Sequence, residues 1–403
     1  MFSTHDSIKP LLPHVSGKEK YELYKAVKEC PIDINSEFSK WRYWDDFSLS
    51  AYYEKEYSDA VFAYSTLITL NLFPTSERER ILSNATWFDA IHPEKTSTGL
   101  ITLHQRIETL KKNIQPSQNI VSRCAHFIYL KGVEFGLHHF LAILSAVKKM
   151  GNFFKNIFIY NDIEPTSSNV WWSCVKSLPS VQIVNIIPPS MLNGNPVKYK
   201  QHQADIIRLE VLYHLGGVYF DLDMCTYQDF TDLIESTKEI TMVNESYGRV
   251  SNAFIIAKPE SAFIYKWREE YRTKYGNSGI DWWAGLSVEM PHTLSIGYTG
   301  CTLLPTSTTL PFDYFYTDFF TLPKDKCTLE MSNTKCIHLW DTEQQKRGIL
   351  PETIEELKRT NSMMWDVFKD ILEEYRVDTT MSYLLTEVKN LRKKVEELSK
   401  KDS

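Results

Sequence analysis

The central part of this sequence predicts an α/β fold built on a parallel sheet. Short apolar strands at 124–130, 157–161 and 181–187 alternate with helical periodicity at 137–150 and 170–178. Strands that are joined through helices pair in parallel, and such sheets bind ligands at the carboxyl ends of their strands. A hydrophobic content of 43% over 403 residues is enough for a substantial packed core. We therefore expect the ligand site at that edge of the sheet.

The segments on either side of this central part show only helical patterns. Residues 1–115 carry helical periodicity that is interrupted by Pro31, Pro74 and Pro93, and proline ends or kinks a helix. We expect a helical N-terminal region whose role the sequence does not reveal. Residues 350–376 predict a helical extension after the central part.

The last residues predict a short coiled coil. Over 377–403, apolar side chains recur at the a and d positions of three heptads, and Leu occupies each d position. An isolated helix of this length is only marginally stable in water, so it needs a partner. We expect a homo-oligomer formed through residues 381–398. An amphipathic helix that docks on the protein's own surface is the alternative.

Charge, cysteine content and targeting signals narrow the function classes. The net charge of −6 disfavours nucleic acid as the principal partner, because binding a phosphate backbone needs a basic surface. The sequence shows no signal peptide and no apolar run of membrane-spanning length. The seven cysteines form no C-x-x-C pair, which is typical of a reducing compartment. We expect a soluble, cytoplasmic protein with no transmembrane segment.

The most informative stretch lies near the middle of the chain. Apolar side chains with a helical period fill residues 200–215, and a double glycine then stops the helix. The next residues alternate in polarity, so that in a strand Tyr219, Asp221 and Asp223 would point to one face. The sequence therefore predicts two carboxylates that converge where a strand ends.

The paired carboxylates predict a divalent metal site. Two carboxylates this close repel each other, and an apolar strand cannot compensate their charge, so a cation is the simplest partner. Oxygen ligands select Mg²⁺ or Mn²⁺, which usually keep waters and also bind substrate phosphates. The alternative is an exposed acidic strand end, because Asp-x-Asp is a common tripeptide.

The same stretch resembles a known group of enzymes. A helix with the pattern S/A-D-x-x-R followed by G-G-x-Y-x-D-x-D is typical of glycosyltransferase family 32 and of the glucosyltransferase domains of large clostridial toxins. The residues in register are Asp205, Arg208, Gly216, Gly217, Tyr219, Asp221 and Asp223. The resemblance covers roughly residues 121–345. It implies a GT-A fold, a nucleotide diphosphate sugar as donor, a Mn²⁺ or Mg²⁺ ion, and retention of anomeric configuration.

The resemblance also implies roles for these residues. Asp221 and Asp223 would hold the metal on the donor diphosphate, with Tyr219 beside them in the donor site. Asp205 and Arg208 would bond the hydroxyls of the transferred sugar. Their i, i+3 spacing places both side chains on one helical face, where a surface salt bridge is the alternative.

Four further positions match the family pattern elsewhere in the chain. Tyr129 would stack on the nucleotide base, with a core tyrosine as the alternative. Asn252 would lie near the transferred sugar, with a turn asparagine as the alternative. His338 would complete the metal site, since Mn²⁺ accepts imidazole, with a core histidine as the alternative. Trp340 would offer its indole N–H to the departing phosphate.

Together these observations favour a metal-dependent, retaining hexosyltransferase. The donor would be a nucleotide diphosphate sugar, with UDP-hexose considered before GDP-mannose, and the acceptor would be a glycan or another hydroxyl group. A toxin-like transferase that modifies a host protein is one alternative. A non-catalytic sugar-binding scaffold is another, although a scaffold has no need of a metal–diphosphate pair.

Overall fold

The computed structural model describes residues 98–375, except 132–133, 167, 193, 198, 246–248 and 277–283. The helices expected before residue 98 and the coiled coil expected over 377–403 lie outside these residues. The chain falls into two units. Of the described residues, one unit contains 98–113 and 185–203, and the other contains 114–184 and 204–375.

The described part of the smaller unit consists of a helix and a hairpin. The helix is α5 (Thr98–Ile114), and the strands β4 (Met191–Leu192) and β5 (Asn195–Pro196) pair antiparallel. Nε of Arg106 donates to the carbonyl of Asn185 at 3.2 Å. This bond fastens the helix to the segment that leads into the hairpin.

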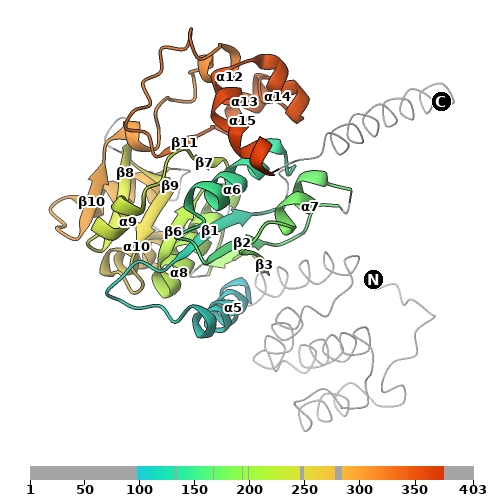
Figure 1. Ribbon diagram of the computed structural model, residues 1–403. Coiled ribbons are helices and arrows are strands. Elements are labelled where there is room, and N and C mark those ends of the chain that lie inside the picture. Colours follow the sequence, from blue (N-terminus) through green and yellow to red (C-terminus); the bar gives the residue numbers. More distant parts are fainter. Residues whose placement is uncertain are drawn as a thin grey trace, which may run out of the picture. The chain divides into compact units, whose positions relative to one another are not determined.

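The larger unit is built on a seven-stranded sheet with the order β10-β8-β9-β6-β1-β2-β3 (Figure 1). β2 and β6 both pair with β1 in parallel, as the alternation of strands and helices predicts. β9 runs antiparallel between β6 and β8, and β10 pairs in parallel with β8. The predicted α/β fold with a largely parallel central sheet is confirmed. The strands are β1 (Cys124–Tyr129), β2 (Asn156–Asn161), β3 (Val181–Asn185), β6 (Gly217–Phe220), β8 (Ile240–Glu245), β9 (Arg249–Ala257) and β10 (Cys301–Leu304).

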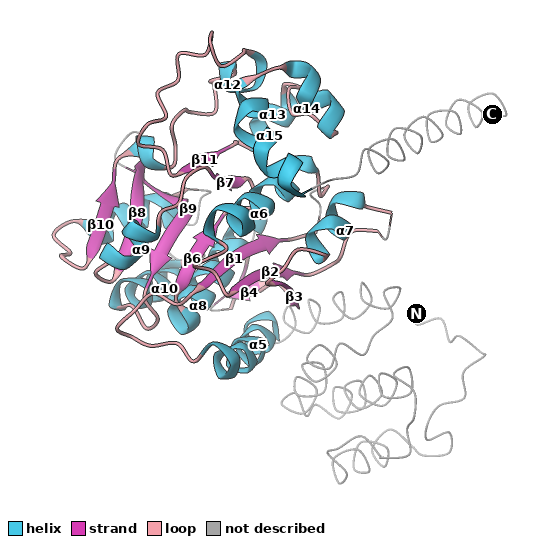
Figure 2. Cartoon of the chain, viewed as in Figure 1, coloured by secondary structure: helices cyan, strands magenta, loops and turns pink. Residues whose placement is uncertain are grey.

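Helices separate most of these strands along the chain (Figure 2). α6 (Leu137–Met150) follows β1, α7 (Val170–Lys176) follows β2, and α8 (Lys200–Leu215) precedes β6. The bounds of α6 and α8 agree with the predicted helices. None of the described helices has the length and hydropathy that crossing a membrane requires. The remaining helices are α9 (Thr231–Ser236), α10 (Ala262–Lys274), α11 (Met290–Ser295), α12 (Asp318–Thr321), α13 (Asp341–Lys346), α14 (Ile354–Thr360) and α15 (Met363–Tyr375), with the π-helix η1 (Gly285–Glu289) and the 3₁₀-helix η2 (Thr306–Thr308).

Alternate side chains of the strands face two different layers. The rings of Phe127 in β1 and Phe220 in β6 stack with centroids 5.1 Å apart, and Phe254 in β9 lies 5.5 Å from Phe220. These rings form one buried cluster with α6, which lies in front of the sheet in Figure 1 and is buried over most of its length. The intervening residues, such as His126, point to the opposite face, as the period of two in a strand requires.

The segment after the sheet belongs to the same core. α15 contributes Phe368, Ile371 and Leu372 to the buried cluster, and α14 contributes Leu357. The ring of Tyr375 at the end of α15 lies 5.4 Å from that of Phe140 in α6. The residues for which a helical extension is expected therefore pack on α6 and share its hydrophobic core.

Candidate active site

The double glycine before β6 lets two strands come together at the site. Gly216 and Gly217 both have positive φ, at 62° and 104°, a region that glycine enters without steric penalty. A Cβ on Gly217 would lie 2.5 Å from the carbonyl oxygen of Cys124 in β1. The glycines therefore do more than stop α8, because they also allow β6 to lie directly against β1.

The Asp-x-Asp motif lies in a turn rather than in a strand. We expected the alternation to continue to residue 223, but β6 ends at Phe220. The amide of Met224 donates to the carbonyl of Asp221 at 3.0 Å and closes the turn, after which β7 (Met224–Thr226) begins. The prediction of one shared strand face was therefore wrong, because the chain turns before it reaches Asp223.

His338 joins the carboxylates of this turn from a separate strand. β11 (Cys336–His338) pairs antiparallel with β7. Nε2 of His338 lies 3.2 Å from Oδ1 of Asp223. Burial alone would lower the pKa of His338, but the charges of Asp223 and Asp221 outweigh it and raise this pKa to about 9.

These three side chains offer a donor set that fits a divalent ion. One ligand atom from each of Asp221, Asp223 and His338 lies within 4.8 Å of the others. Two carboxylate oxygens and an imidazole nitrogen suit Mn²⁺, while Mg²⁺ prefers oxygen alone. Nε2 of His338, the nitrogen that faces Asp223, would be the imidazole ligand. The residues present therefore fit a metal of this kind.

Arg208 links the carboxylate turn to α8. Its Nη1 lies 3.1 Å from Oδ1 of Asp221, which also accepts the O–H of Tyr219 at 2.7 Å. The guanidinium carbon lies 4.4 Å from the centre of the Tyr219 ring. Burial raises the pKa of Asp221, and Asp223 adds to this shift while Arg208 opposes it. Arg208 is thus a built-in counter-ion for Asp221.

Asp205 lies one turn before Arg208 and is 1% exposed, so the pair is buried and is not a surface salt bridge. Oδ1 of Asp205 lies 3.1 Å from Nη2 of Arg208 and accepts Nδ2 of Asn252 at 2.9 Å. Oδ2 accepts the O–H of Tyr271 at 2.6 Å and the O–H of Ser287. No sequence pattern marks Tyr271 or Ser287, because they reach Asp205 only through the packing of α10 and η1.

Asn252 lies against this buried pair. In addition to its side-chain bond to Asp205, its carbonyl accepts Nη1 of Arg208 at 2.5 Å. Its backbone belongs to β9 and not to a turn. The structure therefore brings Asn252 together with the two residues beside which the resemblance places it.

Trp340 does not present its indole N–H to the carboxylate turn. The N–H donates to the carbonyl of Phe312 at 3.1 Å, so donation to a departing phosphate, which stays a prediction, would require this bond to break. The ring packs on His338 with centroids 4.1 Å apart, and Trp340 adopts a left-handed φ of 55° just before α13. In this arrangement the ring of Trp340 supports the position of His338.

Tyr129 packs inside an aromatic cluster at the end of β1. Its ring lies 5.3 Å from that of Phe135 and 5.5 Å from that of Trp172. Only 6% of its surface is exposed, which leaves little ring face for a nucleotide base. Burial raises the pKa of Tyr129 to about 12. This environment corresponds to the core tyrosine that was the alternative.

A second group of polar residues, Asp341 with His138 and His139, supports Asp223. The amide of Asp341 donates to Oδ2 of Asp223 at 2.9 Å. Oδ2 of Asp341 in turn lies 3.2 Å from Nε2 of His139 and 3.6 Å from Nε2 of His138, both in α6. Burial acts to raise the pKa of Asp341, but the hydrogen bonds from both histidines outweigh it and hold this pKa well below its usual range.

The tautomer of His139 argues against a second metal at this group. The amide of Gly136 donates to Nδ1 of His139 at 3.0 Å, so the proton of the neutral ring belongs on Nε2. Nε2 therefore offers an N–H to Asp341, where a metal would need a lone pair. Burial lowers the pKa of His139 to about 4 and keeps the ring neutral. The position of Asp341 directly after His338-Leu339-Trp340 is the sequence signal that could have marked this group.

A cavity of about 630 Å³ opens beside the second group. Its walls come from the segments that follow β1 and β2 and from the loop after α13, so it lies at the carboxyl ends of the parallel strands. His138, which lies beside Asp341, is part of its wall. The volume is within the usual range for ligand pockets.

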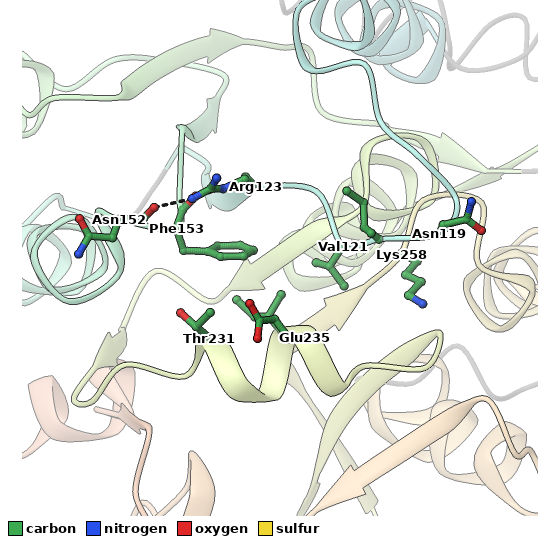
Figure 3. A pocket seen from close by; sticks show the side chains of 10 residues that line it. Asn119, Val121, Arg123, Asn152, Phe153, Thr231, Glu235 and Lys258 are labelled. Atoms are coloured by element: carbon green, nitrogen blue, oxygen red, sulfur yellow. Dashed lines mark hydrogen bonds between the residues drawn. The ribbon is translucent and has the colours of Figure 1, made fainter.

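A second cavity, of about 470 Å³, lies where β1 and β2 begin, at the end of these strands opposite the first cavity (Figure 3). Its walls come from the segments that precede β1 and β2, from α9, and from Lys258 after the antiparallel β9. Nη2 and Nε of Arg123 donate to the carbonyls of Asn152 and Phe153 at 2.5 and 2.8 Å. None of the site residues expected from the sequence lines this cavity.

The fold and the site define an α/β protein with an Asp-x-Asp turn beside its sheet. Residues 155–240 match the family model described as "Glycosyltransferase sugar-binding region containing DXD motif". The matched segment contains Asp205, Arg208, Asp221 and Asp223, the residues that carry the resemblance seen in the sequence. That resemblance is confirmed, and residues 155–240 are similar to this sugar-binding region.

One curated relative extends the match beyond the motif. "Glucan organizing enzyme 1" of Cryptococcus neoformans var. grubii serotype A is 30% identical to this chain over 200 residues. The aligned part is 45% of this chain and 52% of the relative. The chain thus spans about half the length of that curated relative.

Several solved glycosyltransferase structures resemble the chain at low identity. GlyE of Streptococcus pneumoniae TIGR4 is 14% identical with a TM-score of 0.39, over 64% of this chain and 63% of GlyE. LgtC, solved with donor and acceptor sugar analogues, is 10% identical with a TM-score of 0.36, over 59% of this chain and 99% of LgtC. The PaToxG glycosyltransferase is 18% identical with a TM-score of 0.32, over 49% of this chain and 74% of PaToxG. Likeness at this level carries no argument about function.

Proposed function

We propose that this protein is a metal-dependent, retaining glycosyltransferase that transfers a hexose from a nucleotide diphosphate sugar to a hydroxyl acceptor. One observation carries the proposal. Ligand atoms of Asp221, Asp223 and His338 lie within 4.8 Å of one another, and the two aspartates belong to the segment that matches the sugar-binding family. Retention is the outcome that the sequence resemblance implies.

The metal would be held by these three side chains. When bound, a divalent ion supplies positive charge that stabilises the negative charge developing on the leaving diphosphate. Because His338 contributes a nitrogen, Mn²⁺ is preferred over Mg²⁺ in this proposal. The bond from the Asp341 amide would keep the Asp223 carboxylate in one orientation for that ion.

The donor nucleoside would occupy the cavity at the carboxyl ends of β1 and β2. That cavity adjoins Asp341 through His138, and Asp341 bonds Asp223, so nucleoside and diphosphate would lie in neighbouring positions. The buried face of Tyr129 makes ring stacking on the base a minor contribution, so other lining groups would select the base. UDP-hexose stays ahead of GDP-mannose as the first donor to test.

Arg208 would bind the sugar end of the donor. Asp221 and Asp205 raise the pKa of Arg208 against the opposing effect of burial, so the guanidinium stays charged throughout the working pH range. Its planar fork is fixed between Asp205, Asp221 and the carbonyl of Asn252. A charge held in this way orients a sugar hydroxyl without reorganising during the reaction.

The acceptor is the least constrained part of the proposal. The curated relative's printed name concerns glucan, which favours a glycan over a protein as acceptor. The toxin-like alternative has no comparable support from the described residues.

A donor-hydrolysis screen tests the proposal without knowledge of the acceptor. The full chain would be incubated with UDP- and GDP-sugars in the presence of Mn²⁺, Mg²⁺ or chelator, and free sugar would be measured. We expect Mn²⁺-dependent hydrolysis of at least one donor and a loss of about 100-fold in Asp223→Asn. Asp232→Asn, an exposed carboxylate of α9, is the matched control and should retain activity.

Two results would overturn the proposal. If Asp223→Asn keeps the donor hydrolysis of the wild type, then the carboxylate turn is not part of the active site. A wild-type chain that hydrolyses no donor with either metal would reject the transferase, and donor binding measured by calorimetry would then decide for the sugar-binding scaffold.

A further inference from the structure

Two aromatic side chains are exposed side by side on the loop between η2 and α12. Tyr314 and Phe315 are 40% and 68% exposed, and their ring centroids lie 4.1 Å apart. Neither residue lines one of the two cavities described above. Large apolar side chains that cluster on the surface of a soluble protein often mark a binding site. These two rings, the aromatic pair, therefore need a functional explanation.

The loop that carries the aromatic pair is anchored to α13 and the residues around it. The carbonyl of Tyr314 accepts Nε2 of Gln344 at 3.1 Å and also accepts Nη1 of Arg347. The carbonyl of Phe312 accepts the indole N–H of Trp340 at 3.1 Å. A ligand that binds an anchored loop spends little free energy on ordering the chain. The two rings are thus presented to solvent in a preformed arrangement.

The aromatic pair is connected to the metal cluster through the ring of Trp340. On one side Trp340 packs on His338 with centroids 4.1 Å apart, and on the other side its centroid lies 5.9 Å from that of Tyr314. His338 is one of the three candidate metal ligands. A molecule that covers the aromatic pair would therefore lie beside the metal cluster.

The aromatic pair and the cavity of about 630 Å³ lie on different faces of α13. Gln344 contacts the loop of the aromatic pair, whereas Gln345 lines the cavity. Successive residues of a helix point about 100° apart, so the two side chains belong to different faces. The metal cluster lies at the start of the same helix, where the Asp341 amide bonds Asp223. With the donor nucleoside in the cavity, the face of the aromatic pair is left for the second substrate.

We propose that Tyr314 and Phe315 form the binding surface for the acceptor, and that the acceptor bound there is a saccharide. This inference rests on the proposed function, in which the donor occupies the cavity and the metal cluster. Both residues lie outside the segment that matches the family model, so that match assigns them no role.

A hexose ring has the chemistry that this surface fits. One face of many pyranose rings carries only C–H groups, which pack on the electron-rich face of an aromatic ring. The hydroxyls at the edge of the sugar need polar partners, and exposed Asp313 and Arg347 lie beside the aromatic pair. Oδ1 of Asp313 accepts the amide of Phe315 at 2.9 Å, and the guanidinium carbon of Arg347 lies 5.9 Å from the centre of the Phe315 ring. The surface thus combines rings for the sugar face with charged groups for its hydroxyls.

Saccharide binding to the full chain tests the inference without donor or metal. Trisaccharides of glucose, galactose and mannose would be titrated up to about 10 mM and followed by NMR. We expect at least one of them to bind, and Phe315→Ala to weaken that binding about tenfold. Phe315→Trp keeps an aromatic ring and should bind as tightly as the wild type. No binding to the wild type, or equal binding to Phe315→Ala, would overturn the inference.

Phe315→Leu distinguishes a sugar-stacking ring from a general apolar contact. Leucine keeps apolar surface but has no aromatic face, so its affinity should fall nearly as far as that of Phe315→Ala. An affinity that Phe315→Leu retains would indicate the kind of apolar contact that a protein partner makes, and it would contradict stacking on a hexose.

Tyr265→Ala is the matched control. Tyr265 is also an exposed aromatic residue, at 49%, but it lies in α10 and its ring neighbours Tyr213. Its removal should change saccharide affinity by less than about twofold, as is usual for surface positions. A tenfold loss in Tyr265→Ala would show that saccharides stack on any exposed ring, and the assignment to Tyr314 and Phe315 would fail.

Transfer kinetics separate this inference from the proposed function. With donor, Mn²⁺ and a saccharide that binds, we expect the hexose to be transferred to that saccharide. In Phe315→Ala the acceptor KM should rise about tenfold, with a smaller change in the donor KM. A wild type that hydrolyses donor but never glycosylates the bound saccharide overturns the acceptor site alone. A wild type that binds the saccharide through Phe315 but hydrolyses no donor rejects the proposed function and confirms the saccharide surface.

Discussion

The backbone N–H of Asp341 donates to Oδ2 of Asp223 at 2.9 Å, so the start of α13 holds one carboxylate of the Asp-x-Asp turn. The carboxylate of Asp341 is fixed in turn by the neutral ring of His139. The orientation of Asp223 therefore depends on α6, although α6 contributes no atom to the three-residue ligand cluster.

Asp341→Asn should weaken metal binding without removing a ligand. The change keeps the size of the side chain but loses the charge that the two histidines surround, so α13 should start less rigidly. We expect the Mn²⁺ concentration for half-maximal donor hydrolysis to rise about tenfold, as is usual for groups that orient a metal ligand. Asp366→Asn removes a carboxylate of α15 that pairs with Lys369 and serves as the control. An unchanged metal requirement in Asp341→Asn would contradict this support role.

The stability of the protein should fall in mild acid because of His126. Burial lowers the pKa of His126 to about 4, from 6.5 in an unfolded chain. Its Nε2–H donates to the carbonyl of Gly216 at 2.8 Å, so Nδ1 accepts the hydroxyl of Tyr160 and the neutral form is required. Between pH 6.5 and 4, His126 is therefore protonated in the unfolded chain but neutral in the folded chain. This contribution is fully present above pH 6.5 and is lost as the pH falls towards 4, by roughly 3 kcal/mol in total.

The measurement is the free energy of unfolding as a function of pH, for the wild type and for His126→Gln. The comparison uses the slope between pH 6.5 and 4, so it does not depend on the stability that the substitution itself removes. We expect a smaller slope in the variant, while His139, whose pKa is lowered in the same way, preserves part of it. Equal slopes would show that His126 does not titrate as described.

Gly217→Ala should strongly destabilise the fold. The new methyl group would meet the Cys124 carbonyl at 2.5 Å at a φ of 104°, so strain and a backbone clash add together. We expect a loss of about 3 kcal/mol or more in the free energy of unfolding. Gly297→Ala is the matched control, because Gly297 also has a positive φ but has no atom within 4 Å of the added Cβ. Its loss should be about 1 kcal/mol. Similar losses at both positions would exclude the clash as the cause.

Phe368→Ala should remove a main contact of the C-terminal helices. Phe368 is completely buried in the cluster that α6 and the sheet share, and replacing such a ring by Ala costs about 3–5 kcal/mol. Val367→Ala, at the half-buried neighbouring position, should cost about 1 kcal/mol. Denaturant unfolding measures both losses. A loss below that of Val367→Ala would show that α15 is not part of the cooperative core.

The sequence correctly predicted the helices and strands that have a clear local pattern. The helix of 137–150 and the strands around it have clear periods and closing residues, and the structure confirms them almost residue by residue. Asp205 and Arg208 were expected on one face of one helix, and they lie in contact. Their i, i+3 spacing alone was enough for that.

Features that depend on packing could not be read from the sequence. Tyr271 lies in α10, and nothing in the sequence pattern shows which residue of this helix turns towards Asp205. The end of β6 was placed three residues late, because polar alternation continues through a turn that only its hydrogen bonds reveal. The hydrogen bond from the Trp340 indole to the carbonyl of Phe312 could not be predicted, because Phe312 belongs to a loop with no regular pattern.

Because α15 packs on α6, the folded core extends further along the chain than the resemblance to the transferase family. The resemblance to the transferase family ends near residue 345. Phe140 in α6 is nevertheless fully buried, and the ring of Tyr375 is one of the groups that cover it. A chain that ends at residue 345 would expose this apolar face of α6 to solvent. We expect such a chain to aggregate, which would prevent an assay of the sugar site. The shortest piece that can be assayed is therefore set by the hydrophobic face of one helix and not by the last residue of the site.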